Sequence, residues 1–268
     1  MKMLLKDGKR RVLTLSYDDG VIFDRRLIEI LDKHGIKCTF NINTSREGND
    51  NWNLSPDERV ELYKNSGHEV AVHGYTPPFF EQLNPQELIH EVLLDRKNIE
   101  RDYGVITRGL AYPFGTYNDD VIDTLAKCGI VYARTVNNTN SFAFPDNWLK
   151  LHPTAHHKAE NLMELAKDFV ENETRAKWAS RMFYLWGHSY EFHNDNNWEV
   201  IEEFAEYIGG RDNIWYATNI EIYDYVTAYR RLERSYDDTI IHNPSVIDVW
   251  VEINDNTYCI KGGETITL

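Results

Sequence analysis

The sequence has few of the features that mark membrane-spanning or disulfide-bonded proteins. Only three of its 268 residues are cysteines, and these are far apart and set among apolar neighbours, so we expect neither a disulfide framework nor a zinc knuckle. No stretch approaches the ~18–20 consecutive apolar residues of a membrane span. At the amino terminus, Asp7 interrupts the chain before any apolar run long enough for a signal peptide. We therefore expect a cytoplasmic protein.

Basic residues are also scarce. The chain has 29 Lys and Arg against 43 Asp and Glu, which gives a formal net charge of −14. General binding to nucleic acid or to an anionic membrane needs a basic surface, so we expect neither partner. The chain has no GxxxxGK[ST] pattern, which argues against nucleotide hydrolysis on a phosphate loop. The 42% hydrophobic and 27% charged content is ordinary for a folded globular enzyme.

Short apolar runs alternate with amphipathic stretches along most of the chain. Two helix starts are explicit, because Ser55-Pro56 and Asn84-Pro85 each place a capping residue before a proline at the first helical position. Strands alternating with helices predict a parallel sheet, open or closed, in an α/β fold. The seven predicted strands are 12–16, 38–43, 69–73, 108–112, 130–134, 181–186 and 213–218.

The pattern changes after about residue 233. Residues 246–253 alternate with a period of two, and Asn254-Asp255-Asn256 has the composition of a hairpin turn. We therefore expect a main α/β domain over residues 1–233 and a small antiparallel β appendage over residues 234–268, packed on the main domain.

Chemistry-bearing residues follow four of the predicted strands. In parallel α/β proteins the functional site forms beyond the carboxyl ends of the strands, so these residues are expected to converge. Taken alone, Asp18-Asp19-Gly20 is an ordinary turn sequence, and His73 alone fits a core histidine. Placed together after buried strands, the carboxylates and imidazoles favour a divalent-metal site instead. The segments concerned are 16–20, 73–75, 112–115 and 187–191.

These segments resemble the motifs of the polysaccharide deacetylase (NodB-homology) family, also described as carbohydrate esterase family 4. SYDDG at 16–20 resembles the first motif, and GHEVAVHGYT at 67–76 the second. RGLAYPFGTYND at 108–119 is similar to the third, and YLWGHSYEF at 184–192 to the histidine-bearing last motif. All four occur in the family's order, across roughly residues 12–225. The resemblance implies an irregular seven-stranded (β/α) barrel, of the deformed TIM type.

The resemblance also implies catalytic roles. Asp18 would be the general base that activates water, and His188 the general acid that protonates the leaving group. The backbone N–H of Phe114 would help to stabilise the tetrahedral oxyanion. Arg108 would orient Asp18 through a charge-assisted pair, although it is farther from the glycine of its motif than is usual.

The expected metal ligands are incomplete. The resemblance makes Asp19 and His73 ligands of a divalent metal, with zinc the first expectation, but the family's second histidine is replaced by Pro77. Three explanations remain open: a ligand from elsewhere, a weakly held metal, or lost activity. His156-His157 is the obvious substitute pair, although such a pair also fits a solvated turn.

We expect hydrolysis of an acetyl group from a carbohydrate or related small substrate, at an amide or less readily at an ester. Tyr75, Tyr112 and Tyr190 are the expected substrate contacts, because aromatic side chains suit stacking on sugar rings. Trp186, in a strand, is expected to pack in the core. The alternatives are a carbohydrate-binding relic of the same fold and a hydrolase of a small cyclic amide.

Overall fold

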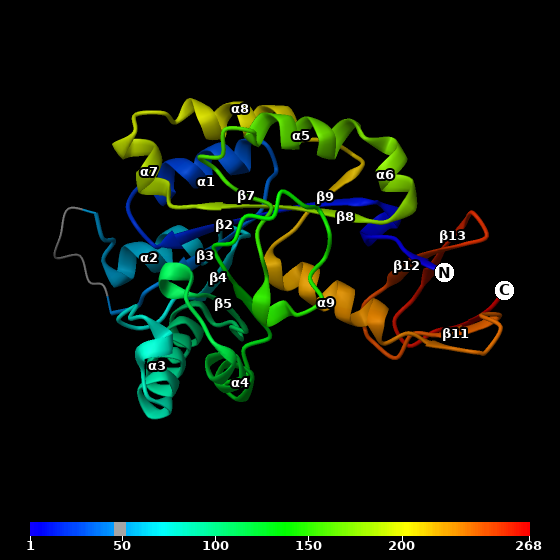
Figure 1. The fold of residues 1–268 in the computed structure, drawn as a ribbon, viewed down its shortest axis with the longest axis horizontal. Helices are drawn as coiled ribbons and strands as arrows, with labels where there is room; N and C mark the ends of the chain where they lie inside the picture. Colours follow the sequence, from blue (N-terminus) through cyan, green and yellow to red (C-terminus); the bar gives the residue numbers. More distant parts are fainter. Residues whose placement is uncertain (46–51) are drawn as a thin grey trace.

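A computed structural model describes residues 1–45 and 52–268 of the chain (Figure 1). Its centre is a sheet of parallel strands whose residues are almost all buried, as expected for strands covered on both faces. In chain order the strands are β2 (Arg11–Asp19), β3 (Cys38–Ile42), β4 (Glu69–Val72), β5 (Gly109–Ala111), β6 (Tyr132–Arg134), β7 (Ala155–His156), β8 (Arg181–Gly187) and β9 (Ile214–Tyr216).

The sheet curls into an irregular barrel. Its strands follow the order β6-β5-β4-β3-β2-β8-β7, and β9 pairs with the start of β2. The segment that contains Leu151 and β7 closes the curl. Leu151 accepts a hydrogen bond from Thr135 N–H at 2.9 Å and donates to Ala133 at 3.0 Å, while β7 pairs with β8. The expected deformed (β/α) barrel of seven strands is therefore confirmed, with β9 beside it.

Helices surround the sheet, with α5 and α8 over one side and α3, α4 and α9 over the other (Figure 1). Both predicted cap-then-proline starts are confirmed, because Ser55 and Asn84 form capping boxes with Glu58 and Glu87. The α-helices are α1 (Asp24–Lys33), α2 (Pro56–Tyr63), α3 (Pro85–Tyr103), α4 (Asp119–Lys127), α5 (Leu162–Glu171), α6 (Glu173–Trp178), α7 (Ser189–Asn194), α8 (Glu199–Ile208) and α9 (Asn219–Arg230). The 3-10 turns are η1 (Lys6–Gly8), η2 (Phe80–Gln82), η3 (Pro113–Gly115) and η4 (Trp148–Lys150).

The core lies between the sheet and this helical layer. The apolar stripe of α1 shows the arrangement, because Leu27 and Leu31 are fully buried on the same side of the helix. Burial of each such side chain contributes about 1.5–3 kcal/mol. No helix within residues 1–45 and 52–268 has the length and apolar character needed to cross a membrane.

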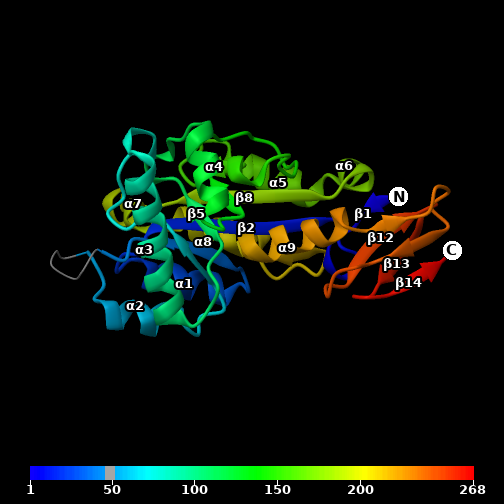
Figure 2. The same cartoon turned by 90° about the horizontal axis from the view of Figure 1, so that it is seen from below.

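The carboxyl-terminal residues form antiparallel β structure at the amino-terminal ends of the barrel strands (Figure 2). As expected, a two-residue turn joins β12 to β13, with Asn254 and Asp255 both at positive φ (49° and 62°). β1 pairs with β12, so the first residues of the chain share a sheet with this appendage. The division at residue 233 stays a prediction. The strands are β1 (Lys2–Met3), β10 (Glu233–Arg234), β11 (Ile240–His242), β12 (Val249–Ile253), β13 (Asn256–Ile260) and β14 (Thr265–Thr267).

Candidate active site

The carboxyl ends of β2, β4, β5 and β8 meet around one cavity of about 500 Å³. This is the end of the barrel opposite the appendage. The sequence motifs that resemble the deacetylase family therefore converge, as the parallel topology requires. The cavity is lined by Asp18, Asp19, His73, Pro77, Tyr112, Pro113, Phe114, Gly115, Val136, Trp186, His188 and Tyr190.

Asp18 is the most deeply held of the acidic groups in the cavity. Its side chain is almost fully buried, Asn41 donates to its Oδ1 at 2.8 Å, and the guanidinium of Arg134 donates to its Oδ2. Burial raises the pKa of Asp18, but the opposing effects, of which the charge of Arg134 is the largest, outweigh it and hold the pKa below its ordinary value. Asp18 is therefore held as an ionised carboxylate, which is the state that a general base requires.

Asp19 and His73 line the same cavity as Asp18. Asp19 has a positive φ of 81°, an uncommon conformation for a residue other than glycine. His73 Nδ1 lies 2.9 Å from the carbonyl oxygen of Ala111. Because a carbonyl only accepts, Nδ1 carries the proton, and the lone pair of Nε2 faces Asp18 and Asp19 at 3.9 and 4.0 Å. Such an oriented imidazole suits metal binding.

The third expected ligand position does not supply a donor. Pro77 lines the same cavity, beside Asp19 and His73, and its side chain has no atom that binds a metal. The two remaining expected ligands, Asp19 and His73, are fewer than the three of a typical catalytic zinc site. Asp19 and His73 therefore fit a weakly held ion rather than a complete zinc centre.

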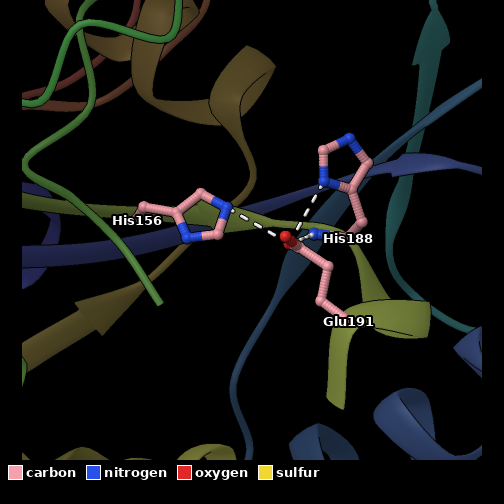
Figure 3. Close-up of side chains that lie close together, drawn as sticks. All are labelled: His156, His188 and Glu191. Carbon is pink, nitrogen blue, oxygen red and sulfur yellow. Dashed lines mark hydrogen bonds and ion pairs between the residues drawn. The ribbon is translucent and has the colours of Figure 1, made fainter. Parts of the chain in front are cut away.

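His188 stands at the end of β8 and is held by Glu191 (Figure 3). The carboxylate of Glu191 lies 3.2 Å from His188 Nδ1 and accepts the His188 backbone N–H at 3.0 Å. His188 Nε2 faces Asp18 Oδ2 at 3.9 Å. Burial lowers the pKa of His188, but the bond to Glu191 and the charge of Asp18 outweigh it and raise the pKa above its usual value. The protonated imidazole is therefore favoured.

Phe114 and Tyr112 form the β5 side of the cavity. Phe114 has a positive φ of 56° within η3, which is strained for an aromatic residue. Its exposed ring stacks on Phe79, with ring centroids 4.1 Å apart. Tyr112 is buried, and its hydroxyl donates to the carbonyl oxygen of Leu149 at 2.8 Å. That hydroxyl is therefore already engaged by the protein.

The structure brings most of the predicted site residues together. Seven of them line the cavity: Asp18, Asp19, His73, Tyr112, Phe114, His188 and Tyr190. Within the described part of the chain, the lining does not include Tyr75. Its backbone N–H instead donates to the carbonyl of Glu91, on α3, at 3.1 Å. The roles assigned to these residues stay predictions.

The prediction that Arg108 orients Asp18 is wrong. Arg108 precedes β5, at the amino-terminal end of the barrel, and donates to Asp224 on α9 at 2.6 Å. Arg134 occupies the expected place, because it ends β6 and so lies at the same end of the barrel as Asp18. The strand at 130–134 was predicted, so the rule that sites form at strand ends could have identified Arg134.

Two other residues were underestimated by the sequence analysis. Trp186, expected only to pack in the core, is buried yet lines the cavity, and the guanidinium of Arg134 stacks over its ring at 4.4 Å. Glu191 had no predicted role, although its position three residues after His188, at the start of α7, was a visible signal. Glu191 contacts His188, which was predicted, and Trp186 lines the same cavity as the predicted residues.

Comparison with known proteins agrees with the motifs. Residues 5–133 match the family model described as polysaccharide deacetylase. The resemblance to that family is confirmed. Chitin deacetylase 1 of Cryptococcus neoformans var. grubii is 31% identical over 122 residues, which are 45% of this chain and 25% of that protein. The chain spans from a quarter to just over half of the length of the curated relatives that it matches.

Solved structures related to the deacetylase family share the fold. A candidate polysaccharide deacetylase from Mycobacterium smegmatis superposes with a TM-score of 0.64 at 16% identity, over 88% of this chain and 96% of that one. A family 4 acetyl xylan esterase from Clostridium thermocellum, solved with a cobalt ion, gives a TM-score of 0.52 at 15% identity, over 80% and 91% of the two chains. At such identities the likeness establishes the fold alone.

Proposed function

We propose that the chain is a hydrolase that removes acetyl groups from a carbohydrate or a related small substrate, with an N-acetyl amide as the first candidate. The observation that carries the proposal is the pairing of Asp18 with His188 across the cavity, where Oδ2 and Nε2 lie 3.9 Å apart. Hydrolysis of an amide needs a base that takes a proton from water and an acid that protonates the departing amine. The lowered pKa of Asp18 favours the base form, and the raised pKa of His188 favours the acid form. The family resemblance supports the same reaction.

The proton transfers in the proposed reaction balance. Asp18 takes a proton from water as the water oxygen bonds to the acetyl carbon. The tetrahedral intermediate then collapses, the carbon–nitrogen bond breaks, and the proton of His188 Nε2 goes to the departing amine. Acetate and the free amine are the products. Glu191 accepts from Nδ1 of His188 and so keeps the second proton directed towards the cavity.

Two further groups would serve the charge that develops on the acetyl oxygen. We assign the backbone N–H of Phe114 to this role, and the strained φ of 56° supports it, because strain of this kind concentrates at functional sites. A divalent metal, zinc by expectation, would be held by Asp19 and His73 with water in its remaining positions. Such an ion would polarise the acetyl carbonyl when bound.

The rim of the cavity suits a sugar ring. Tyr190 lines the cavity and packs against His188, with ring centroids 5.0 Å apart, so a substrate placed at the acid would meet an aromatic face. Tyr112 supplies a second aromatic wall. Carbohydrates stack on such rings through their C–H faces, which favours these residues as substrate contacts.

One alternative rests on a specific observation. Pro77 removes a metal ligand, which is the change expected in a carbohydrate-binding relic that no longer hydrolyses its ligand. The retained pairs of Asp18 with Arg134 and of His188 with Glu191 favour the enzyme, because sugar binding alone needs neither a base nor an acid.

The test is acetate release from a panel of substrates by the full chain supplied with zinc or cobalt(II). N-acetylated chito-oligosaccharides, an O-acetylated sugar and a small cyclic amide separate the possible reactions. Acetate from the first is the expected result. Sugar binding without release of acetate would support a carbohydrate-binding protein that has lost activity. Hydrolysis of the cyclic amide alone would mean that the protein is a cyclic-amide hydrolase and not a deacetylase.

A further inference from the structure

A second cluster of imidazole and carboxylate side chains lies at the Nδ1 edge of His188 (Figure 3), whereas Nε2 of the same ring faces Asp18. Glu191 Oε2 lies 3.2 Å from His156 Nε2 and 3.2 Å from His188 Nδ1. A third imidazole nitrogen, His157 Nε2, is 3.4 Å from the same oxygen. Three histidines from two segments therefore converge on one carboxylate.

His157 packs tightly against this cluster. The side chain is 1% exposed, and among the described residues neither of its ring nitrogens has a hydrogen-bond partner. Its ring is stacked between Tyr17 and Phe192. A Cβ atom on Gly187 would lie 2.1 Å from His157 Nδ1, so only glycine at the end of β8 leaves room for the ring. Glu191 Oε2, at 3.4 Å from Nε2, is therefore the polar group that faces this buried imidazole.

We propose that His156, His188 and Glu191 form a binding site for a divalent transition metal such as zinc, separate from the Asp19–His73 pair. The three ligand atoms lie within 4.8 Å of one another. Tetrahedral zinc with bonds of about 2.0–2.2 Å separates its ligand atoms by roughly 3.3–3.6 Å, so the two observed 3.2 Å separations need little adjustment. Two histidines and one glutamate are also a known ligand set of catalytic zinc.

Lys158 orients the carboxylate of this cluster. Lys158 Nζ lies 3.2 Å from Glu191 Oε1 and 2.7 Å from Asp195, so it holds the carboxylate by one oxygen and leaves Oε2 towards the histidines. The cluster thus has an oriented carboxylate oxygen that faces the histidines.

Occupation of this site has a consequence for His188, and this step rests on the proposed function. A metal on Nδ1 takes the lone pair that would otherwise receive a proton, so the ring cannot become an imidazolium. His188 could then no longer act as the general acid. Zinc in excess of the amount that supports turnover is therefore expected to inhibit acetate release.

Zinc titration by calorimetry tests the binding itself, on the chelator-stripped full chain. His156→Ala removes one ligand without touching the proposed acid, and Glu191→Gln removes the anion. His90→Ala, at an exposed histidine on α3, is the matched control for loss of an imidazole. We expect about tenfold or greater weakening of one zinc site in the first two variants, and none in the control.

His73→Ala assigns the remaining binding. One zinc equivalent that persists in His73→Ala and disappears in His156→Ala would support the second site. Equal zinc stoichiometry and affinity in the wild type, His156→Ala and Glu191→Gln would overturn it, as would no zinc binding at all. Cobalt(II) absorption in the visible range provides a second measurement, because loss of the site in a folded variant removes its bands.

The same protein samples separate this inference from the proposed function. Acetate release without a zinc site that depends on His156 would overturn the inference and leave the deacetylase proposal standing. A zinc site that depends on His156, in a protein that releases no acetate, would support the zinc site and contradict the deacetylase proposal.

Discussion

The buried ion pair between Arg134 and Asp18 can be removed one partner at a time. Both side chains are almost fully buried, at 0% and 3% exposure. Arg134→Met keeps an unbranched apolar chain against Trp186 but leaves the Asp18 carboxylate without its guanidinium. Loss of one partner from a buried pair costs about 3–5 kcal/mol, a large share of the roughly 5–15 kcal/mol that stabilises a typical domain. We expect that loss in the free energy of unfolding.

A double-mutant cycle separates the unpaired charge from lost packing. In Arg134→Met/Asp18→Asn neither charge remains, so the double variant should be more stable than Arg134→Met by at least about 1 kcal/mol, although it carries one more substitution. Urea unfolding followed by tryptophan fluorescence measures all variants. Arg108→Met is the control, because its pair with Asp224 is about one-third exposed and should contribute at most about 1 kcal/mol.

Two results would refute this reasoning. One is an Arg134→Met variant that unfolds within about 1 kcal/mol of the wild type, which would mean that water screens the pair as it screens a surface pair. The other is a double variant no more stable than the single one, which would mean that the contact of Arg134 with Trp186, rather than its charge, stabilises the site.

The remaining predictions concern the far end of the barrel, the metal and the packing of β8. Burial raises the pKa of Glu69 from 4.5 to about 7, so the folded protein binds more protons than the unfolded chain between these values, and stability falls as the pH rises through them. In Glu69→Gln, the decrease in the free energy of unfolding between pH 4.5 and pH 7.5, measured by urea titration, should be smaller by about 1–3 kcal/mol. An unchanged decrease would contradict this prediction. Pro77→His should tighten zinc binding about tenfold or more in calorimetry, whereas Pro78→His, outside the cavity lining, should not. Gly187→Ala should cost about 1–3 kcal/mol in urea unfolding, because the new methyl group would strike the His157 ring, and a neutral effect would show that the ring can move.

Much of the fold was predictable because local signals agree with the topology. The capping residues Ser55 and Asn84 mark their helices, and the buried apolar runs mark the strands of the barrel. The rule that parallel strands end at one edge then collects Asp18, His73 and His188 without any knowledge of distances. These residues do line one cavity.

The details that depend on long-range contacts were not predictable. The guanidinium that reaches Asp18 is not one of these details, because Arg134 ends its predicted strand and Arg108 begins its own, so the rule that sites form at strand ends favours Arg134. Strand β7 has two residues, too few for any periodic pattern, yet it carries His156 to Glu191. The convergence of these side chains comes from the curl of the sheet, which the sequence pattern does not encode locally.

Acetate release by the wild type and by Asp18→Asn, each supplied with zinc or cobalt(II), tests the central claim most directly. Asparagine keeps the shape of the side chain and can still accept from Arg134, but it cannot take a proton from water. We predict release from an N-acetylated chito-oligosaccharide by the wild type, and loss of most turnover in a variant that still binds metal. Undiminished release by Asp18→Asn would contradict the assignment of the base, and no release by folded, metal-supplied wild type from any acetylated sugar would contradict the function.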